Sequence, residues 1–290
     1  MSAMKMKNYP NRPENPGSSR LRKSIYLLPN LFTAGNLVLG ILSIAFAIND
    51  SLTLSLAAET KVTPFLWPAR LIVIAAFMDF IDGFVARLTN TTSKFGMEFD
   101  SLSDLISFGV APAMLIYLSV LRYIPFWGLF IMALYVVCAA IRLARFNVQA
   151  QIEEKTQFMG LPSPAAAGLL ASYVLFSQWG GWYGKGIFLN KVMGWYEENI
   201  SVIDLRIIPI LTVVIALVMV SSIRYPSMKK LKGETVKPIT LGLIVMLVFS
   251  LFYAFEFTSF VFLSSYLLWG IAQTLIKTLG KIKKPRTAAP

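Results

Sequence analysis

Long apolar runs separated by short polar stretches dominate the pattern of hydrophobic positions along this chain. Each run is about 20 residues long, which is the length of helix that crosses the hydrocarbon core of a bilayer. The runs cover about residues 25–48, 64–88, 98–121, 125–146, 161–179, 206–223, 237–255 and 258–279. The pattern therefore predicts an all-α protein, a polytopic membrane helical bundle of about eight transmembrane helices.

Composition agrees with this prediction and removes several kinds of chemistry. The chain is 56% hydrophobic and only 14% charged, which excludes an ordinary soluble domain. It has no histidine, which excludes His-based catalytic triads and His-type zinc sites. The single cysteine, Cys138, lies inside the fourth run and is expected to pack as a small apolar residue.

The positive charges predict the orientation in the membrane. All but six of the 27 Lys and Arg residues lie in the amino-terminal arm, the loops after the second, fourth and sixth runs, or the carboxyl-terminal end. The positive-inside rule then places both termini in the cytoplasm, as an even number of spans requires. We expect a protein of a prokaryotic cytoplasmic membrane whose basic ends attract anionic lipid headgroups. No nucleic-acid partner is expected, because topology explains the basic charge.

Four carboxylates interrupt this apolar pattern. Asp79 and Asp82 lie on one face of the second predicted helix, and Asp100 and Asp104 share a face of the third. A carboxylate at the bilayer centre costs about 2.5–3.5 kcal/mol, so four together need compensation. Hard divalent cations are the expected partners, with the site at the cytoplasmic ends of these two helices. The alternative is that the acids pair with Arg87 and Lys94.

Small residues share the face of the first two acids. Gly83 and Ala86 lie one turn beyond Asp79 and Asp82, and they would let a nucleotide base or ribose lie against the backbone. The same residues also suit close packing between membrane helices. Gly96 is expected to open the third helix or to let the substrate approach it closely.

A family resemblance rests on these residues. The pattern D-x2-D-G-x2-A-R-x8-G-x3-D-x3-D, from Asp79 to Asp104, resembles the signature of the CDP-alcohol phosphotransferase family, with every fixed position matched. The segments 28–33, 141–147 and 158–168 look like the bacterial and archaeal phosphatidylserine synthases of that family. The resemblance covers roughly residues 25 to 175.

The resemblance implies an enzyme that transfers a phosphatidyl group from CDP-diacylglycerol to the hydroxyl of L-serine, releasing CMP. It implies two divalent cations, magnesium or manganese. Asp79, Asp82 and Asp100 are the expected metal ligands, and Asp104 is expected to be a ligand or the general base. A homodimer is implied by resemblance alone. Glycerol 3-phosphate, inositol or an inositol phosphate are the alternative acceptors. A cation transporter is a remote alternative, because its polar groups should extend through the bilayer depth.

Further residues are expected to hold the two substrates. For the CDP group these are Asn30, Thr33, Gly83, Ala86, Arg87 and Gly96. Asn30 and Thr33 follow Pro29, so they would equally suit a helix start, and Arg87 would equally suit a helix C-terminus. For the acceptor they are Arg142, Arg145 and Ser163, because arginine recognises carboxylates through a rigid donor fork. The alternative role of the two arginines is anchoring at the membrane surface.

These expectations divide the chain into five parts. Residues 1–24 form a basic cytoplasmic arm, disordered or lying on the membrane surface, and residues 25–179 form the catalytic core. Residues 180–205 form an extracytoplasmic loop whose aromatic residues suit an interfacial belt. Residues 206–279 add further transmembrane helices, and residues 280–290 form a basic cytoplasmic tail.

Overall fold

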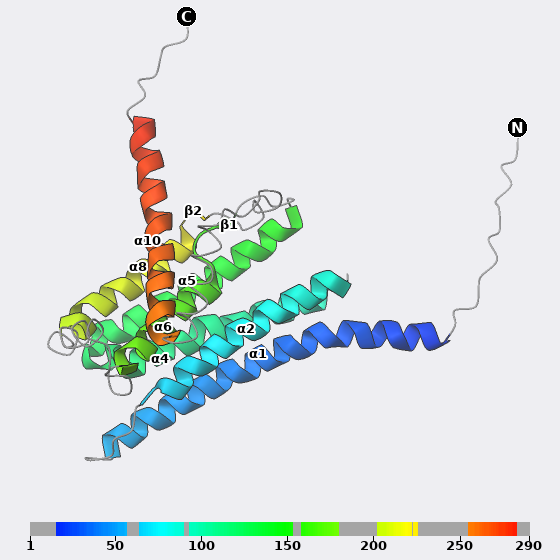
Figure 1. Cartoon of the computed structure of the whole chain (residues 1–290), viewed down its shortest axis with the longest axis horizontal. Coiled ribbons are helices and arrows are strands. Elements are labelled where there is room, and N and C mark those ends of the chain that lie inside the picture. The colour runs from blue at the N-terminus through cyan, green and yellow to red at the C-terminus, as the bar shows by residue number, and fades with distance from the viewer. Residues whose placement is uncertain are drawn as a thin grey trace, which may run out of the picture.

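The computed structural model describes residues 16–56, 64–89, 93–152, 158–179, 202–221, 223–225 and 255–282. Within these ranges the regular structure is helical apart from one pair of two-residue strands. The elements are α1 (Pro16–Leu56), α2 (Leu66–Thr89), α3 (Lys94–Asp104), η1 (Leu105–Val110), α4 (Ala111–Ser119), η2 (Leu121–Tyr123), α5 (Pro125–Ile152), β1 (Phe158–Met159), α6 (Ser163–Trp179), η3 (Ile203–Ile207), α8 (Ile208–Val220), β2 (Arg224–Tyr225) and α10 (Phe255–Ile282). Figure 1 shows their arrangement.

Several of these helices suit a membrane. In the described part of the chain, five segments are long and apolar enough to cross one: Asn30–Leu56, Lys94–Ser119, Pro125–Gln149, Ile203–Val220 and Phe255–Thr274. The helix α2 is 24 residues long but carries two acids and two arginines, and α6 has 17 residues. These features agree with the predicted helical membrane protein. The predicted span 237–255 lies outside the described residues except for its last residue, so the number of eight spans stays a prediction.

Two helices begin earlier than the hydrophobic pattern predicts. The helix α1 begins at Pro16, inside the segment expected to be an arm. The helix α3 begins at Lys94 rather than near residue 98, because the Ser93 side chain caps it by accepting a hydrogen bond from the Gly96 N–H at 2.9 Å. Directly after Asp104 the helix widens into the π-helical turn η1 and then continues as α4. The widened turn therefore adjoins the last acid of the motif.

The helices α1 and α2 lie side by side (Figure 1). The helix α3 and the turn η1 also pack against α1. Hydroxyl groups fix the second contact: Ser103 donates to the Thr33 carbonyl at 3.0 Å, and Ser107 to the Asn36 carbonyl at 2.9 Å. A Cβ on Gly40 would lie 2.9 Å from the Ser107 Cα, so only glycine permits this approach. These contacts set the height of α3 relative to α1 and α2.

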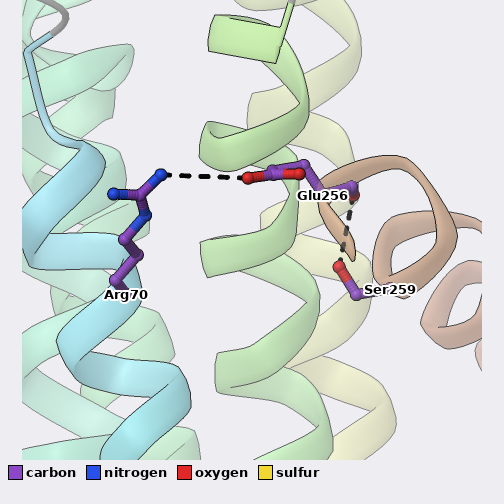
Figure 2. Close-up of polar contacts among 3 residues, drawn as sticks. All are labelled: Arg70, Glu256 and Ser259. Carbon is purple, nitrogen blue, oxygen red and sulfur yellow. Dashed lines mark hydrogen bonds and ion pairs between the residues drawn. The ribbon is translucent and has the colours of Figure 1, made fainter. Parts of the chain in front are cut away.

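The helix α6 lies at the centre of the described structure, where it contacts α2, α8 and α10. Residues 169–176 of α6 are all buried. At one end of α10, Arg70 of α2 pairs with Glu256 at 3.9 Å, and the Glu256 carbonyl accepts a hydrogen bond from Ser259 (Figure 2). Because the Arg70 side chain is 45% exposed, this pair contributes little beyond orientation.

The strands β1 and β2 form a short antiparallel pair at the entrance to α6. Gly160, which follows β1, has φ +80° and donates its N–H to the Ile223 carbonyl at 2.8 Å. A Cβ at this position would lie 2.3 Å from the Met219 carbonyl oxygen. Glycine is therefore required here both for its backbone conformation and for the close approach of α8.

Candidate metal and acceptor site

Three of the four predicted acids meet in one place. Asp79 and Asp82 of α2 and Asp100 of α3 each offer a carboxylate oxygen, and these three oxygens lie within 4.8 Å of one another. Asp82 is 5% exposed, and the other two are partly buried. The structure thus brings acids from two helices into one convergent group.

The chemistry of this group fits a hard divalent cation. Two carboxylates about 4.8 Å apart repel by roughly 3.5 kcal/mol at an effective dielectric of about 20. Asp100 Oδ1 is buried and has no hydrogen-bond partner among the described residues. An all-oxygen donor set with an unsatisfied buried lone pair suits Mg²⁺ or Mn²⁺. Asp79, Asp82 and Asp100 therefore fit the cations that the family resemblance implies.

Asp104 lies beside this group but has a different partner. Its Oδ1 accepts a hydrogen bond of 3.3 Å from the amide of Asn36 on α1. The other atom of that amide, Asn36 Oδ1, is buried and has no partner within the described ranges. The sequence reasoning missed Asn36, although it continues the three-residue spacing of Asn30 and Thr33 along α1.

The predicted CDP-binding residues of α1 lie next to the acids. The Thr33 hydroxyl donates to Asp82 Oδ2 at 3.0 Å, and this contact is buried. The Asn30 Oδ1 atom lies 3.2 Å from where a Cβ of Gly96 would be. Because glycine has no Cβ, α3 can lie this close to α1. A Cβ on Gly83 would meet nothing within 4 Å, so open space adjoins α2 there.

The CDP-binding role of all six residues in this set stays a prediction. Ala86 is partly buried, and the side chain of Arg87 lies outside the described part of the structure. The open space beside Gly83 is the feature of this set that favours a flat ligand over helix packing.

The predicted acceptor residues divide into two arrangements. Arg142 donates from Nη1 to the Ser163 hydroxyl at 2.7 Å, which joins α5 to the first residue of α6. Its guanidinium lies within electrostatic range of Asp104 and Asp79. Arg145 instead donates from Nη1 to the Val220 carbonyl at the end of α8, at 3.2 Å. The structure therefore brings Arg142 and Ser163 toward the acids and directs one arm of Arg145 to the backbone.

One further contact holds the acid-bearing helix in place. Asn147 of α5 donates to Ser101 Oγ at 2.8 Å, and Ser101 Oγ lies 3.2 Å from Asn147 Oδ1. Ser101 directly follows Asp100, so this contact fixes the height of α3 against α5. Asn147 belongs to a segment that carries the family resemblance, but the sequence pattern assigns it no role.

Comparison with known proteins decides the family. The sequence model of the CDP-alcohol phosphatidyltransferase family matches residues 26–203, which is more than half of the chain. This chain belongs to that family. The resemblance read from the acid motif is therefore confirmed, and the match contains all four acids together with Arg142 and Ser163.

The names of several curated relatives of this chain refer to serine. The chain is 37% identical over 252 residues to the CDP-diacylglycerol–serine O-phosphatidyltransferase of Helicobacter pylori strain 26695, covering 87% of this chain and 92% of that protein. It is 33% identical over 139 residues to the enzyme of the same name from Bacillus subtilis, covering 48% and 70%. It is 32% identical over 216 residues to the archaetidylserine synthase of Methanothermobacter thermautotrophicus, covering 73% and 75%.

Proposed function

We propose that this protein transfers the phosphatidyl group of CDP-diacylglycerol to the hydroxyl of L-serine, giving phosphatidylserine and CMP. The observation that carries the proposal is the group of Asp79, Asp82 and Asp100 oxygens beside Asp104, with the Arg142 guanidinium in electrostatic range. The serine acceptor is supported by the names of the relatives from Helicobacter pylori and Bacillus subtilis.

In this proposal Asp104 accepts the proton of the serine hydroxyl, and Asn36 holds its carboxylate in place. The deprotonated oxygen then forms a bond to the lipid-side phosphorus, and the bond from that phosphorus to the CMP oxygen breaks. Bound divalent cations would neutralise the charge on the pyrophosphate and on the departing CMP. Asp79, Asp82 and Asp100 would hold them, and the remaining predicted CDP residues would contact the nucleotide.

Arg142 is proposed to bind the carboxylate of serine, with Ser163 fixing the orientation of its guanidinium. This assignment separates serine from inositol, which carries no anionic group, whereas glycerol 3-phosphate and inositol phosphate carry a phosphate in place of the carboxylate. Arg145 is assigned a supporting role at the end of α8, because one arm of its fork already serves the Val220 carbonyl.

The membrane arrangement is part of the proposal. The apolar runs support eight spans, and the charge distribution supports cytoplasmic termini and a cytoplasmic site in the inner membrane of a prokaryote. Residues 25–179 are proposed as the catalytic core. In a cysteine-labelling test, Lys94→Cys should react only after the inner membrane is permeabilised, and Lys185→Cys should react from outside. The native Cys138 is buried and gives little background. The reverse pattern would overturn the orientation.

A homodimer is proposed from family membership alone.

The deciding experiment for the reaction uses the purified full-length protein. It is incubated with CDP-diacylglycerol, magnesium or manganese, and each of serine, glycerol 3-phosphate, inositol and inositol phosphate, and CMP release is measured. CMP release with serine supports the proposal. Release with glycerol 3-phosphate or an inositol compound in place of serine would keep the family chemistry and refute the serine acceptor.

A further inference from the structure

The widened turn η1 lies between the acid-bearing helix α3 and the helix α4, and it changes how these two helices face. Five residues of α4 are buried, namely Ala111, Pro112, Ala113, Leu115 and Ile116. On an unbroken α-helix, at about 100° per residue, the middle of this buried set would lie roughly 100° around the axis from Asp100 and Asp104. A π-helical turn takes up about one extra residue, which turns α4 back by about the same angle. The turn therefore lets α4 bury its apolar face while Asp100 still meets the acids of α2.

Pro112 gives the physical reason for a widened turn at this point of the chain. Proline has no backbone N–H, and in an α-helix its ring collides with the carbonyl four residues earlier. For Pro112 that carbonyl belongs to Phe108, which lies inside η1. The chain widens instead, and the Ala111 N–H donates to the Ile106 carbonyl, five residues earlier. The Phe108 carbonyl thus lacks the donor that an ordinary α-helix would give it.

A side chain of another helix supplies a donor to this carbonyl. Tyr135 of α5 is fully buried, and its hydroxyl donates to the Phe108 carbonyl at 3.2 Å. One turn farther along α5, the Ala139 Cβ lies 3.4 Å from where a Cβ of Gly109 would be, so α5 packs closely on η1. The helix α5 thus holds the widened turn by a close contact and by one hydrogen bond. A phenylalanine at position 135 would fill the same space without that bond.

We propose that Tyr135 is a positioning residue for the metal site: its hydroxyl holds η1 in the widened form, which sets the rotation of α3 that brings Asp100 and Asp104 toward the acids of α2. This inference rests on the metal site of the proposed function and deepens it. Tyr135 touches neither substrate nor cation, and it acts through the rotation of α3. Because Mg²⁺ demands near-ideal octahedral geometry, a small rotation of α3 lowers the affinity for the cation.

The test compares the full-length wild type with Tyr135→Phe, which removes a single oxygen atom. The matched control is Tyr117→Phe, which makes the same change in a partly buried tyrosine of α4. For each purified protein in detergent, the thermal midpoint is recorded in chelator and over a range of magnesium and, separately, manganese concentrations. Its dependence on concentration gives the apparent dissociation constant for the cation without any turnover. CMP release with serine is measured over the same concentrations.

Tyr135→Phe should raise the apparent dissociation constant for magnesium by about 3- to 10-fold, which is the range for one neutral hydrogen bond. The magnesium concentration for half-maximal CMP release should rise by a similar factor, and the serine KM at saturating magnesium should stay near the wild-type value. Tyr117→Phe should match the wild type. In the Asp100→Asn background Tyr135→Phe should have a smaller effect, because one of the ligands that it positions has already been changed.

Other outcomes overturn the inference. A lower thermal midpoint in chelator with an unchanged dissociation constant for the cation marks a hydroxyl that only stabilises the fold. Equal effects of Tyr135→Phe with and without Asp100→Asn show that it does not act through the acids. A wild type whose thermal midpoint responds to neither cation removes the metal site and this inference with it. The acceptor is decided separately: CMP release with glycerol 3-phosphate in place of serine refutes the serine acceptor, and the magnesium titration of Tyr135→Phe still decides the role of η1.

Discussion

Replacing Asp100 with asparagine should change stability in opposite directions with and without a divalent cation. In the metal-free protein Asp100 faces two carboxylates, Asp79 and Asp82, within 4.8 Å. At an effective dielectric of about 20, a pair at this distance costs roughly 3.5 kcal/mol, so two such pairs cost about 7 kcal/mol when all three acids are ionised. Proton uptake and solvent reduce this repulsion, and we expect Asp100→Asn to stabilise the chelator-treated protein by about 1–3 kcal/mol.

With magnesium or manganese present the order should reverse. A cation at about 100 times its dissociation constant stabilises the folded protein by about 2.7 kcal/mol, and the variant loses part of this because it lacks one anionic ligand. Turnover should fall by at least about 100-fold, since the cation would contribute directly to charge stabilisation in the reaction.

The assay records the thermal midpoint of the purified protein in detergent, in excess chelator and in excess magnesium, alongside CMP release. Glu98→Gln is the matched control, because Glu98 is an exposed acid on the same helix α3. The control should show neither the gain in chelator nor the loss in magnesium. If Asp100→Asn behaves like Glu98→Gln in both buffers, or if the wild type keeps full activity in chelator, the metal site is refuted.

Three further changes test other parts of the site. Asn36→Leu should lower kcat by about 10- to 150-fold, which is the range for one hydrogen bond to a charged group, and should change either KM little. An unchanged kcat in steady-state kinetics would contradict the role of Asn36 on Asp104. Arg142→Lys should raise the serine KM by a similar factor of about 10 to 150, and Arg145→Lys should raise it less because Arg145 is bonded to Val220. Equal effects of the two lysines would refute that distinction. Gly160→Ala should lower the thermal midpoint, since φ +80° alone costs at least about 1 kcal/mol in a non-glycine residue. The control Gly35→Ala should not lower the thermal midpoint, because a Cβ on Gly35 would meet nothing within 4 Å.

Local pattern was enough to predict membrane helices and the pair of acids on each of two of them. Spans of about 20 apolar residues predict membrane helices because unpaired backbone groups are too costly in lipid. The acid positions follow from the same periodicity, since residues three and four apart share one helix face. Spacing alone therefore places Asp79 and Asp82 together on α2, and the family resemblance that they carry is confirmed by the family match.

Sequence periodicity could not set how the helices are placed against one another. The three-oxygen group needs α2 and α3 at matching heights, which depends on Ser103 and Ser107 reaching carbonyls of α1. The role of Asn36 was missed for the same reason, because its partner Asp104 lies 68 residues away on another helix. A widened turn directly after Asp104 was likewise invisible in a pattern that fits an ordinary helix.

The sequence alone determined the membrane class, the acid motif and the likeness to one family, because each is written in residue type and spacing over a short stretch. The tertiary structure decided which side chains meet: Asn36 with Asp104, Arg142 with Ser163, and Arg145 with the Val220 carbonyl. It also placed α10 against α6 through the stacked rings of Phe260 and Phe176. Such contacts depend on helix heights and crossing positions, which are set by the summed packing of many distant side chains rather than by any local pattern.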